Sequence, residues 1–343
     1  MYYPHAHPPA AAVPLAVAPG VFWLRMSLPF QLDHINLWLL RDGDGWAIID
    51  TGFPNDEARG IWERVLADLE GPVTKLVVTH FHPDHLGLAT WLMERTGAPL
   101  YMTTGEFLTA HAVWNEIGGH GARFMVEQFR QHGLQQDYLS KYEKRGSGYR
   151  QAVPALPEHY HRLMAGDELQ IDGRGWRILI GHGHSPEHAA LYCQELGVLI
   201  SGDMLLPKIS TNISVFAATP DADVLGWYLD SLSEMADAIP GQTLILPSHG
   251  LPFTGVQARV EGLRAHHADR LRALEEVCEA PQSAAGVLGT LFPRALDTHQ
   301  MMFAMGEAIA HLNHLEKAGR LSRIFGADGV IRFMRTINPT AVH

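Results

Sequence analysis

The stretch Thr79-His80-Phe81-His82-Pro83-Asp84-His85 is the most informative one in the chain, because it places four strong metal ligands within six residues. Four ligands this close together cannot all face one ion, but they can divide between two. The apolar run at 75–78 predicts a buried strand before them, and the periodic apolar positions of 86–95 predict a helix after them. Binding sites are commonly built on such turns, which a rigid scaffold holds. A polar loop with Asp84 as an N-cap would leave three histidines unexplained, so we interpret the stretch as a metal site.

The composition of the chain is that of a globular enzyme. Its 343 residues, 46% of them hydrophobic, are enough for two domains, or for one large domain with an appendage, around a full core. The net charge of −11 argues against a general polyanion binder. Only Cys193 and Cys278 are present, which argues against a disulfide framework or a thiolate zinc site, and we interpret both as small core residues.

No segment has the pattern of a signal peptide or of a membrane span. Residues 1–20 are rich in Pro and Ala but lack a basic region and a long apolar run. No stretch approaches the roughly 20 apolar residues that a membrane-spanning helix needs. We therefore expect a cytoplasmic protein with no membrane partner.

Short strands dominate the first part of the chain, and the order of elements then changes twice. A segment from about 105 to 163 reads as inserted helices, and two hairpins follow it. The expected strands are at 21–28, 35–40, 46–50, 75–78, 99–103, 168–171, 176–180, 189–193, 198–200 and 243–246. The expected helices are at 54–69, 86–95, 107–114, 122–131, 135–144 and 224–238.

Three further segments place a ligand-type side chain directly after an apolar strand. They are Gly183-His184-Ser185-Pro186-Glu187-His188, Ser201-Gly202-Asp203 and Pro247-Ser248-His249-Gly250. A single histidine after a strand is more often a hydrogen-bonded structural residue than a ligand. Ligands at the same ends of several strands, however, converge on one rim of a sheet, so the segments together extend the metal site.

The order H-x-H-x-D-H, G-H-S-P-x-H, S-G-D and P-S-H-G, between about residues 20 and 253, resembles that of the metallo-β-lactamase superfamily. The resemblance implies an α/β (α+β) fold, an αββα sandwich of two sheets with helices outside. It also implies two metal ions, each held by three residues and bridged by Asp203. The first set would be His80, His82 and His184, and the second Asp84, His85 and His249. Asp50 matches an acidic residue that would orient a ligand histidine.

Two further histidines, His182 and His188, flank the motif of the first of these segments. The family motif places the ligand directly before Ser185-Pro186, which selects His184 rather than His182. We expect a structural role for His182. His188 would face the substrate cavity or support the ligands, and we predict it to be catalytic together with Asp84.

The chemistry expected from such a site is hydrolysis. A water shared by two divalent ions would lose a proton near neutral pH and attack a carbonyl or phosphoryl centre. Asp84 would orient this nucleophile and relay its proton to the leaving group. Ligands that are all nitrogen and oxygen favour zinc but also suit iron or manganese. An alternative of a different class is a di-iron redox or binding protein with the same site.

The set of Asp84, His85 and Asp203 resembles that of hydroxyacylglutathione hydrolases, lactonases and related thioesterases rather than that of true β-lactamases. We therefore expect a small-molecule substrate, namely a carboxylic ester, thioester or lactone. No basic cluster stands where the glutathione-binding helices of that family would lie. The insertion at 105–163 is expected to form a lid. Its aromatic residues either line an apolar pocket or pack the helices together.

The last part of the chain predicts three helices, at 258–280, 283–291 and 298–318, and then a hairpin at 321–335. This order resembles a winged helix, and some members of the superfamily with such a tail are endoribonucleases. Residues 256–343 hold ten basic and nine acidic residues, which is too weak a field for nucleic-acid binding. We prefer a tail that packs or forms a homo-oligomer, and keep RNA cleavage as the alternative. The predicted domains are an N-terminal extension (1–19), a catalytic domain (20–255) and a winged-helix-like domain (256–343).

Overall fold

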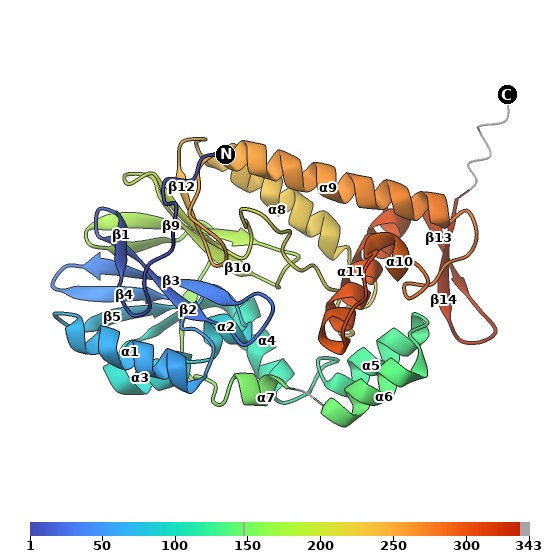
Figure 1. Cartoon of the computed structure of the whole chain (residues 1–343), viewed down its shortest axis with the longest axis horizontal. Helices are drawn as coiled ribbons and strands as arrows, with labels where there is room; N and C mark the ends of the chain where they lie inside the picture. Colours follow the sequence, from blue (N-terminus) through green and yellow to red (C-terminus); the bar gives the residue numbers. More distant parts are fainter. Residues whose placement is uncertain (147, 337–343) are drawn as a thin grey trace. The chain divides into compact units, whose positions relative to one another are not determined.

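The computed structural model describes residues 1–146 and 148–336, which divide into two compact units (Figure 1). The first unit comprises Met1–Trp114, Gly148–Thr211 and Ser231–Val260. The second unit comprises the described residues of Asn115–Ser147, Asn212–Asp230 and Glu261–His343. The chain thus leaves the first unit and returns to it twice before it ends in the second.

The larger sheet of the first unit has seven strands in sequence order. They are β1 (Leu15–Ala18), β2 (Val21–Ser27), β3 (His34–Asp42), β4 (Gly45–Ile49), β5 (Val73–Val77), β6 (Leu100–Thr103) and β7 (His161–Leu163). Neighbours from β1 to β4 pair antiparallel, and those from β4 to β7 pair parallel. β1 belongs to the stretch predicted as an N-terminal extension and is the edge strand of this sheet.

The smaller sheet has five strands in the order β12-β11-β10-β9-β8. They are β8 (Glu168–Ile171), β9 (Arg174–Gly181), β10 (His188–Cys193), β11 (Val198–Gly202) and β12 (Leu244–Pro247). The hairpins β8–β9 and β10–β11 are antiparallel, whereas β12 pairs parallel with β11. β9, β11 and β12 therefore all run in one direction, and their carboxyl ends lie at the same edge of the sheet.

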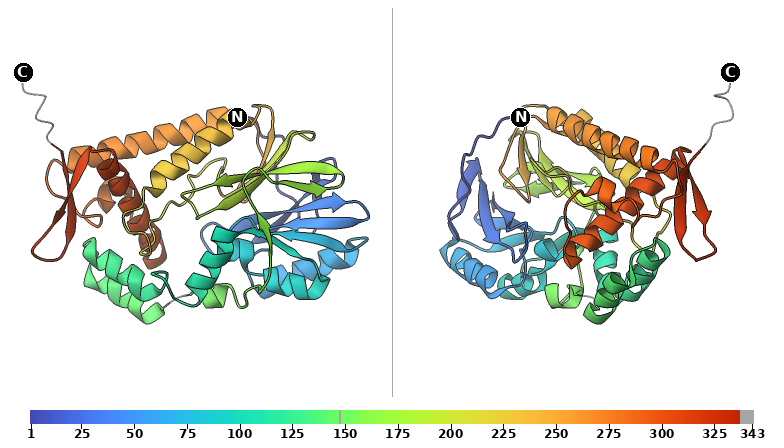
Figure 2. Two further views of the ribbon diagram at one scale, coloured as in Figure 1. Left: turned by 180° about the vertical axis from the view of Figure 1, so that it is seen from behind. Right: turned by 45° about the vertical axis from the view of Figure 1, so that its right-hand side comes forward.

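The core lies between the two sheets, which face each other in both views of Figure 2. Trp23 and Trp38 from the larger sheet and Trp176 from the smaller one are buried in it. Burial of apolar area at about 25 cal/mol per Å² is the main favourable contribution to such a core. The sandwich predicted from the resemblance is confirmed.

Helices cover the outer face of the larger sheet in the first unit (Figure 1). α1 (Asp56–Asp68) begins at Asn55, whose side chain accepts a hydrogen bond from the Ala58 N–H, and it buries Ile61, Trp62 and Val65. The helix predicted at 86–95 is divided into α2 (Pro83–Leu86) and α3 (Ala89–Thr96). The division gives the ligand turn one short helix of its own.

The second unit is mainly helical. It contains α5 (Ala122–Gln131), α6 (Gln136–Arg145), α10 (Leu288–Leu291), α11 (Thr298–Lys317) and the hairpin of β13 (Leu321–Phe325) and β14 (Ile331–Arg335). α8 (Val224–Ala238) and α9 (Val256–Val277) each have residues in both units. The predicted helix at 283–291 is reduced to the single turn of α10, and the winged-helix description stays a prediction. Among the described helices, none has the length and apolar composition needed to cross a bilayer.

The insertion predicted at 105–163 does not form a unit of its own. α4 (Thr104–Trp114) and α7 (Tyr149–Ala152) belong to the first unit, whereas α5 and α6 belong to the second. Within the second unit, buried Tyr142 donates its hydroxyl hydrogen to the Thr298 carbonyl at 2.7 Å. Phe129 packs against the same ring. For these two aromatic side chains, the contacts favour helix packing over lining a pocket.

Candidate metal centre

The structure brings all seven predicted ligands together at the carboxyl ends of the strands of the first unit. Two groups of side chains could each hold a metal ion, and within each group the ligand atoms lie within 4.8 Å of one another. The first group is His80, His82, His184 and Asp203, and the second is Asp84, His85 and His249. The loops after β5, β9, β11 and β12 supply them. Their role as ligands stays a proposal, but the predicted convergence on one rim is observed.

The first group is compact. His80 Nε2 lies 2.9 Å from His82 Nδ1 and 3.2 Å from His184 Nε2. Two nitrogens bound to one tetrahedral zinc ion lie about 3.3 Å apart, given zinc–nitrogen bonds of about 2.0–2.1 Å. Burial and the neighbouring histidines hold the pKa of His80 and of His82 well below the usual value. Both rings are therefore neutral, with lone pairs available to a metal.

Asp203 lies between the two groups and directs one carboxylate oxygen to each. Its Oδ2 lies 3.4 Å from His184 Nε2 and 3.9 Å from His80 Nε2. Its Oδ1 lies 3.3 Å from His249 Nε2 and 3.6 Å from His85 Nε2. This is the arrangement expected of a bridging carboxylate.

In the neutral tautomers that their Nδ1 contacts select, the histidines of the second group direct lone pairs towards carboxylates. Nδ1 of His249 lies 2.8 Å from the His34 carbonyl oxygen, so it carries the hydrogen and leaves a lone pair on Nε2. Nδ1 of His85 likewise donates to Asp50 Oδ2 at 2.8 Å. Lone pairs that face carboxylate oxygens at 3.3–3.6 Å repel unless a positive charge lies between them. The second group is therefore built for a cation.

Unpartnered buried atoms and pKa directions agree with this interpretation. Among the described residues, His85 Nε2 and Asp203 Oδ1 are buried without a hydrogen-bond partner, an arrangement that costs free energy unless another group binds them. Burial alone would lower the pKa of His249, but Asp203 and Asp84 raise it above the usual value. A proton is thus favoured where a metal would bind. The residues present fit two divalent cations with nitrogen and oxygen ligands.

Asp50 contacts His85 of the second group through the ring nitrogen that faces away from Asp203, as predicted. It follows β4 with a φ of 62°, a conformation that is rare outside glycine, and it is 1% exposed. Besides the His85 ring, its carboxylate accepts hydrogen bonds from the N–H and the hydroxyl of Thr79 at 2.8–3.0 Å. These contacts fix the tautomer and orientation of His85.

Other supporting residues were missed in the sequence. Thr211 Oγ1 lies 2.9 Å from His184 Nδ1, and the buried Asn36 donates to the Pro247 and Gly250 carbonyls on either side of His249. No spacing signal could reveal them, because the residues in contact lie 27 to 214 positions apart in sequence.

His188 is fully buried, and its Nε2 accepts the backbone N–H of Asp203 at 3.1 Å. A Cβ on Gly202 would lie 2.3 Å from that same atom, so the close approach requires glycine. Of the two positions considered for His188, the contacts favour support of the ligand loops over facing the cavity. A direct catalytic role for it stays a prediction. His182 is exposed, and its Nδ1 lies 2.6 Å from the Pro186 carbonyl oxygen within its own loop.

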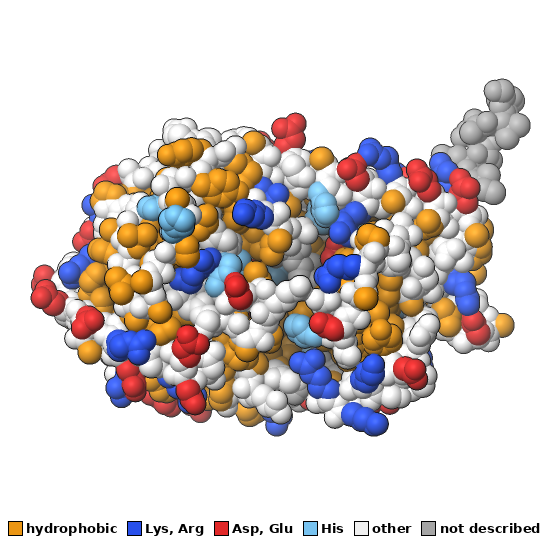
Figure 3. All heavy atoms as spheres, in the orientation of Figure 1, with side chains coloured by type: hydrophobic (Ala, Val, Ile, Leu, Met, Phe, Trp, Pro, Cys, Tyr) orange, Lys and Arg blue, Asp and Glu red, His pale blue; other side chains and the backbone are white. Residues whose placement is uncertain are grey.

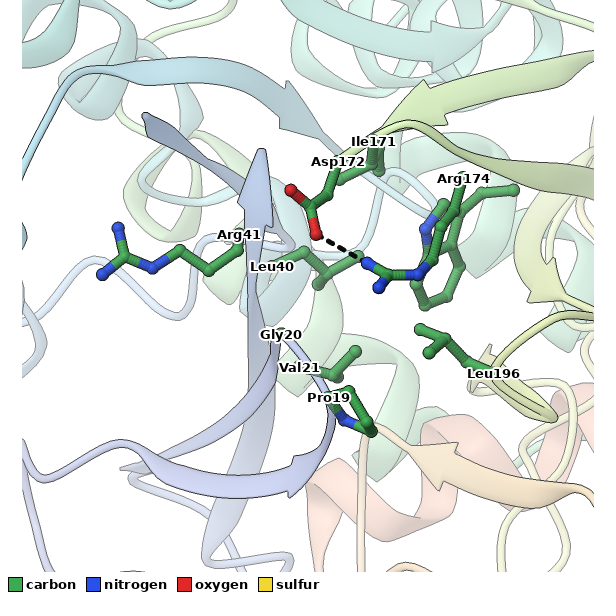
Figure 4. Close-up of a pocket in the computed structure, with 10 residues that line it drawn as sticks. Pro19, Gly20, Val21, Leu40, Arg41, Ile171, Asp172, Arg174 and Leu196 are labelled. Atoms are coloured by element: carbon green, nitrogen blue, oxygen red, sulfur yellow. Dashed lines mark hydrogen bonds and ion pairs between the residues drawn. The ribbon is translucent and has the colours of Figure 1, made fainter. Parts of the chain in front are cut away.

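Two further features lie away from this rim. Both cysteines are buried, as interpreted from the sequence. A cavity of about 10 Å³ lies where the β1–β2 turn approaches the β8–β9 hairpin, beside the ion pair of Asp172 and Arg174 (Figure 4). It has room for roughly one water molecule and is too small for a substrate.

Known proteins are similar to this chain in sequence, and one solved structure is similar in fold as well. A crystal structure of a beta-lactamase domain protein from Burkholderia ambifaria is 47% identical, with a TM-score of 0.92, and the match covers 98% of each chain. The probable metallo-hydrolase YqjP of Bacillus subtilis (strain 168) is 27% identical over 311 residues, which are 86% of this chain and 92% of that protein. The atrochrysone carboxyl ACP thioesterase of Aspergillus chevalieri is 23% identical over 262 residues, 75% of this chain and 65% of that protein.

Family models match two parts of the chain. The model of the metallo-beta-lactamase-like C-terminal domain matches residues 271–336. The model of the metallo-beta-lactamase superfamily matches residues 31–249, more than half of the chain, and this range holds both groups of candidate ligands. The chain therefore belongs to the metallo-beta-lactamase superfamily.

Proposed function

We propose that the protein is a dinuclear metal-dependent hydrolase of a small carboxylic ester, thioester or lactone. The observation that carries the proposal is the position of Asp203, whose two oxygens face the two histidine groups at 3.4 Å and 3.3 Å. Two divalent ions held by His80, His82 and His184, and by Asp84, His85 and His249, would supply Lewis acidity and lower the pKa of water. Zinc is the metal that we expect, with iron or manganese as alternatives.

The side chains have separable tasks. Asp84 is the more exposed of the two candidate ligand carboxylates, at 19% of its side chain against 10% for Asp203. Its Oδ2 lies 3.5 Å from His249 Nε2 and 3.7 Å from His85 Nε2. It can therefore take a proton from the attacking water and pass it to the leaving group. Asp50 acts through His85, which it orients, and His188 supports the backbone of Asp203, while a direct catalytic role for His188 stays a prediction.

One comparison supports acyl substrates. A relative that matches 75% of this chain is named as a carboxyl ACP thioesterase. This name fits hydrolysis of an ester or thioester carbonyl.

The hairpin arginines weigh against the RNA-cleaving alternative. Arg320 pairs with Glu275, Arg323 with Asp221 and Glu316, Arg332 with Asp328, and Arg335 with Glu279. Arginines that already pair with carboxylates contribute little to counterion release from a phosphate backbone. On the face drawn in Figure 3, basic and acidic side chains of the described residues are interspersed. Neither observation favours nucleic acid as a partner.

The proposal is tested by a substrate screen on protein loaded with zinc, manganese or iron and on the same protein after chelation. Aryl esters, acyl thioesters, lactones, a β-lactam and a phosphodiester are compared at equal concentration. We expect metal-dependent turnover of an ester, thioester or lactone that exceeds phosphodiester cleavage at least about a hundredfold. Turnover of the phosphodiester alone would favour the nuclease alternative. Stoichiometric iron with a ligand-dependent colour, and no hydrolysis, would favour the redox alternative.

A further inference from the structure

Glu106 is a buried carboxylate outside both ligand groups. It lies in the first turn of α4 and is 0% exposed. Its Oε2 accepts the backbone N–H of Phe81 at 3.0 Å, and its Oε1 accepts the Ser185 hydroxyl at 2.7 Å and the Glu187 N–H at 2.6 Å. A buried charge is costly unless hydrogen-bonded, and these three donors to one carboxylate make strong, charge-assisted bonds.

The three donors belong to the two loops that carry the first histidine group. Phe81 stands between His80 and His82, and Ser185 directly follows His184. One carboxylate therefore joins the turn after β5 to the turn after β9, which belong to different sheets. The junction therefore lies between the turn that carries His80 and His82 and the turn that carries His184.

The contact is reciprocal. The carboxylate of Glu187 accepts the backbone N–H of Gly105 at 2.7 Å, and its carbonyl accepts the Thr103 hydroxyl at 2.9 Å. A Cβ on Gly105 would lie 2.7 Å from Cδ of Glu187, so a larger residue there would displace the Glu187 carboxylate. The junction of β6 with α4 and the loop after β9 thus hold each other through two carboxylates, two backbone N–H groups and the hydroxyls of Ser185 and Thr103.

The Phe81 peptide is also held from its other side. The hydroxyl of Tyr149, in α7, donates to the Phe81 carbonyl at 2.6 Å. The N–H and the carbonyl of Phe81 are therefore both hydrogen-bonded, to Glu106 in α4 and Tyr149 in α7, two residues of the predicted insertion at 105–163.

We propose that Glu106 is the positioning residue of the first metal site: its carboxylate sets the distance between the His80–His82 turn and His184. The inference rests on the proposed metal-dependent function. Glu106→Gln keeps the size of the side chain but replaces one of its two accepting oxygens with an amide NH₂ group, which can only donate. At least one of the three donors then loses its acceptor, and the two turns separate.

The experiment measures zinc binding to the chelated full-length chain by competition with a chromophoric chelator, which resolves two dissociation constants. In Glu106→Gln we expect one constant to rise about 10- to 100-fold and the other to change less than about threefold. The visible spectrum of Co²⁺ bound at the weakened site should change as well, because ligand geometry sets it. A merely structural role would leave that spectrum unaltered.

The matched control is Asp42→Asn. Asp42 also accepts three hydrogen bonds, from Thr74, Lys75 and the Asp172 N–H, and it also joins the two sheets, but it does so at the opposite edge. The Asp42→Asn substitution should lower the thermal stability of the chain without changing either zinc dissociation constant. Ser185→Ala removes only one of the three hydrogen-bond donors to Glu106. It should raise the zinc dissociation constant of the first metal site about two- to fivefold, and it replaces Glu106→Gln in the test if that variant does not fold.

The outcomes separate the two proposals. Two zinc sites in the wild type with unchanged constants in Glu106→Gln, or in Ser185→Ala where the first variant does not fold, would overturn the role of Glu106 and leave the proposed function intact. Equal weakening in Asp42→Asn would also overturn it. A wild-type chain that binds no metal would remove the proposed function and this inference with it.

Discussion

Asp50 Oδ2 accepts a hydrogen bond from His85 Nδ1 at 2.8 Å, and both side chains are at most 1% exposed. The bond decides which ring nitrogen of His85 faces Asp203. It also explains why an acidic residue occupies a left-handed backbone position, at a φ of 62°, where glycine would be less strained. Strain of this kind is kept where the surrounding contacts determine it.

Asp50→Asn should therefore weaken the second metal site more than the first. Asparagine tolerates the left-handed conformation, but it has lost the charge that holds His85 Nδ1–H. We expect about 10- to 100-fold weaker zinc binding at one site, and a comparable fall in kcat, measured by chelator competition and steady-state kinetics. An unchanged zinc dissociation constant at the second metal site would show that the Asp50 carboxylate does not orient His85.

Asp203→Ala should remove the shared ligand and with it most of the activity. Wild-type protein purified without chelator is expected to hold two metal ions per chain, one for each ligand group, and the variant at most one. Elemental analysis and turnover of the best ester or thioester measure both quantities, with kcat falling at least about a hundredfold. His182→Ala, in the same loop as His184, is the control and should keep both ions. A fully active wild type with one ion would contradict the bridged site.

Charge reversal in the C-terminal hairpin should not affect acyl hydrolysis. Arg320 pairs with Glu275 at the surface, so Arg320→Glu is expected to change ester turnover less than about twofold and RNA binding not at all. Arg323 is a poor choice for this test, because its side chain is only 14% exposed and also bonds Asn313 and Glu316. RNA cleavage by the wild type that is lost in Arg320→Glu, with a steep salt dependence, would promote the nuclease alternative.

The second unit should lose stability in acid because of a buried histidine pair. His267 Nδ1 lies 3.1 Å from His311 Nε2, and both rings are fully buried. Burial, with a contribution from nearby Arg270, lowers the pKa of His267 to about 3 and that of His311 to about 4.

The sign follows from proton binding. An unfolded histidine binds a proton below about pH 6.5, whereas the folded pair stays neutral to about pH 4, so the unfolded state gains protons first as the pH falls. The free energy of unfolding should drop by roughly 1–3 kcal/mol per histidine between these values. Urea titrations of the chelated chain at several pH values test this. His311→Leu should flatten the pH dependence, and exposed His266→Gln should not.

The sequence predicted elements with their own periodicity and failed where only the tertiary structure decides. The strand predicted at 21–28 and the helix at 122–131 agree with β2 and α5 within one residue. β1 was missed, because four residues in a Pro/Ala-rich stretch become a strand only through pairing with β2. The continuous helix predicted at 283–291 is one turn, since residues 284–287 form turns instead.

The candidate ligands could be predicted because several of them lie close together in sequence. The residues that hydrogen-bond to the ligand loops could not be predicted. The spacing of His80, His82 and His85 within one turn is enough to identify them as candidate ligands. Glu106 meets its partners Ser185 and Glu187 across 79 and 81 residues, so nothing local distinguishes it from a helix-starting acid. Long-range pairings of this kind enter a prediction only when the fold itself is known.

The two sheets are fastened at opposite edges by different means. At one edge, the Asp42 carboxylate of the larger sheet accepts the Asp172 N–H of the smaller sheet, a hydrogen bond that needs no metal. At the other edge, His80 and His184 come from different sheets and meet at a candidate metal site. Amide hydrogen exchange after chelation should therefore quicken in the turns that carry the ligands, while the amide of Asp172 stays slow. The sandwich would then loosen from one side only, which makes metal supply a determinant of how long the chain resists proteolysis.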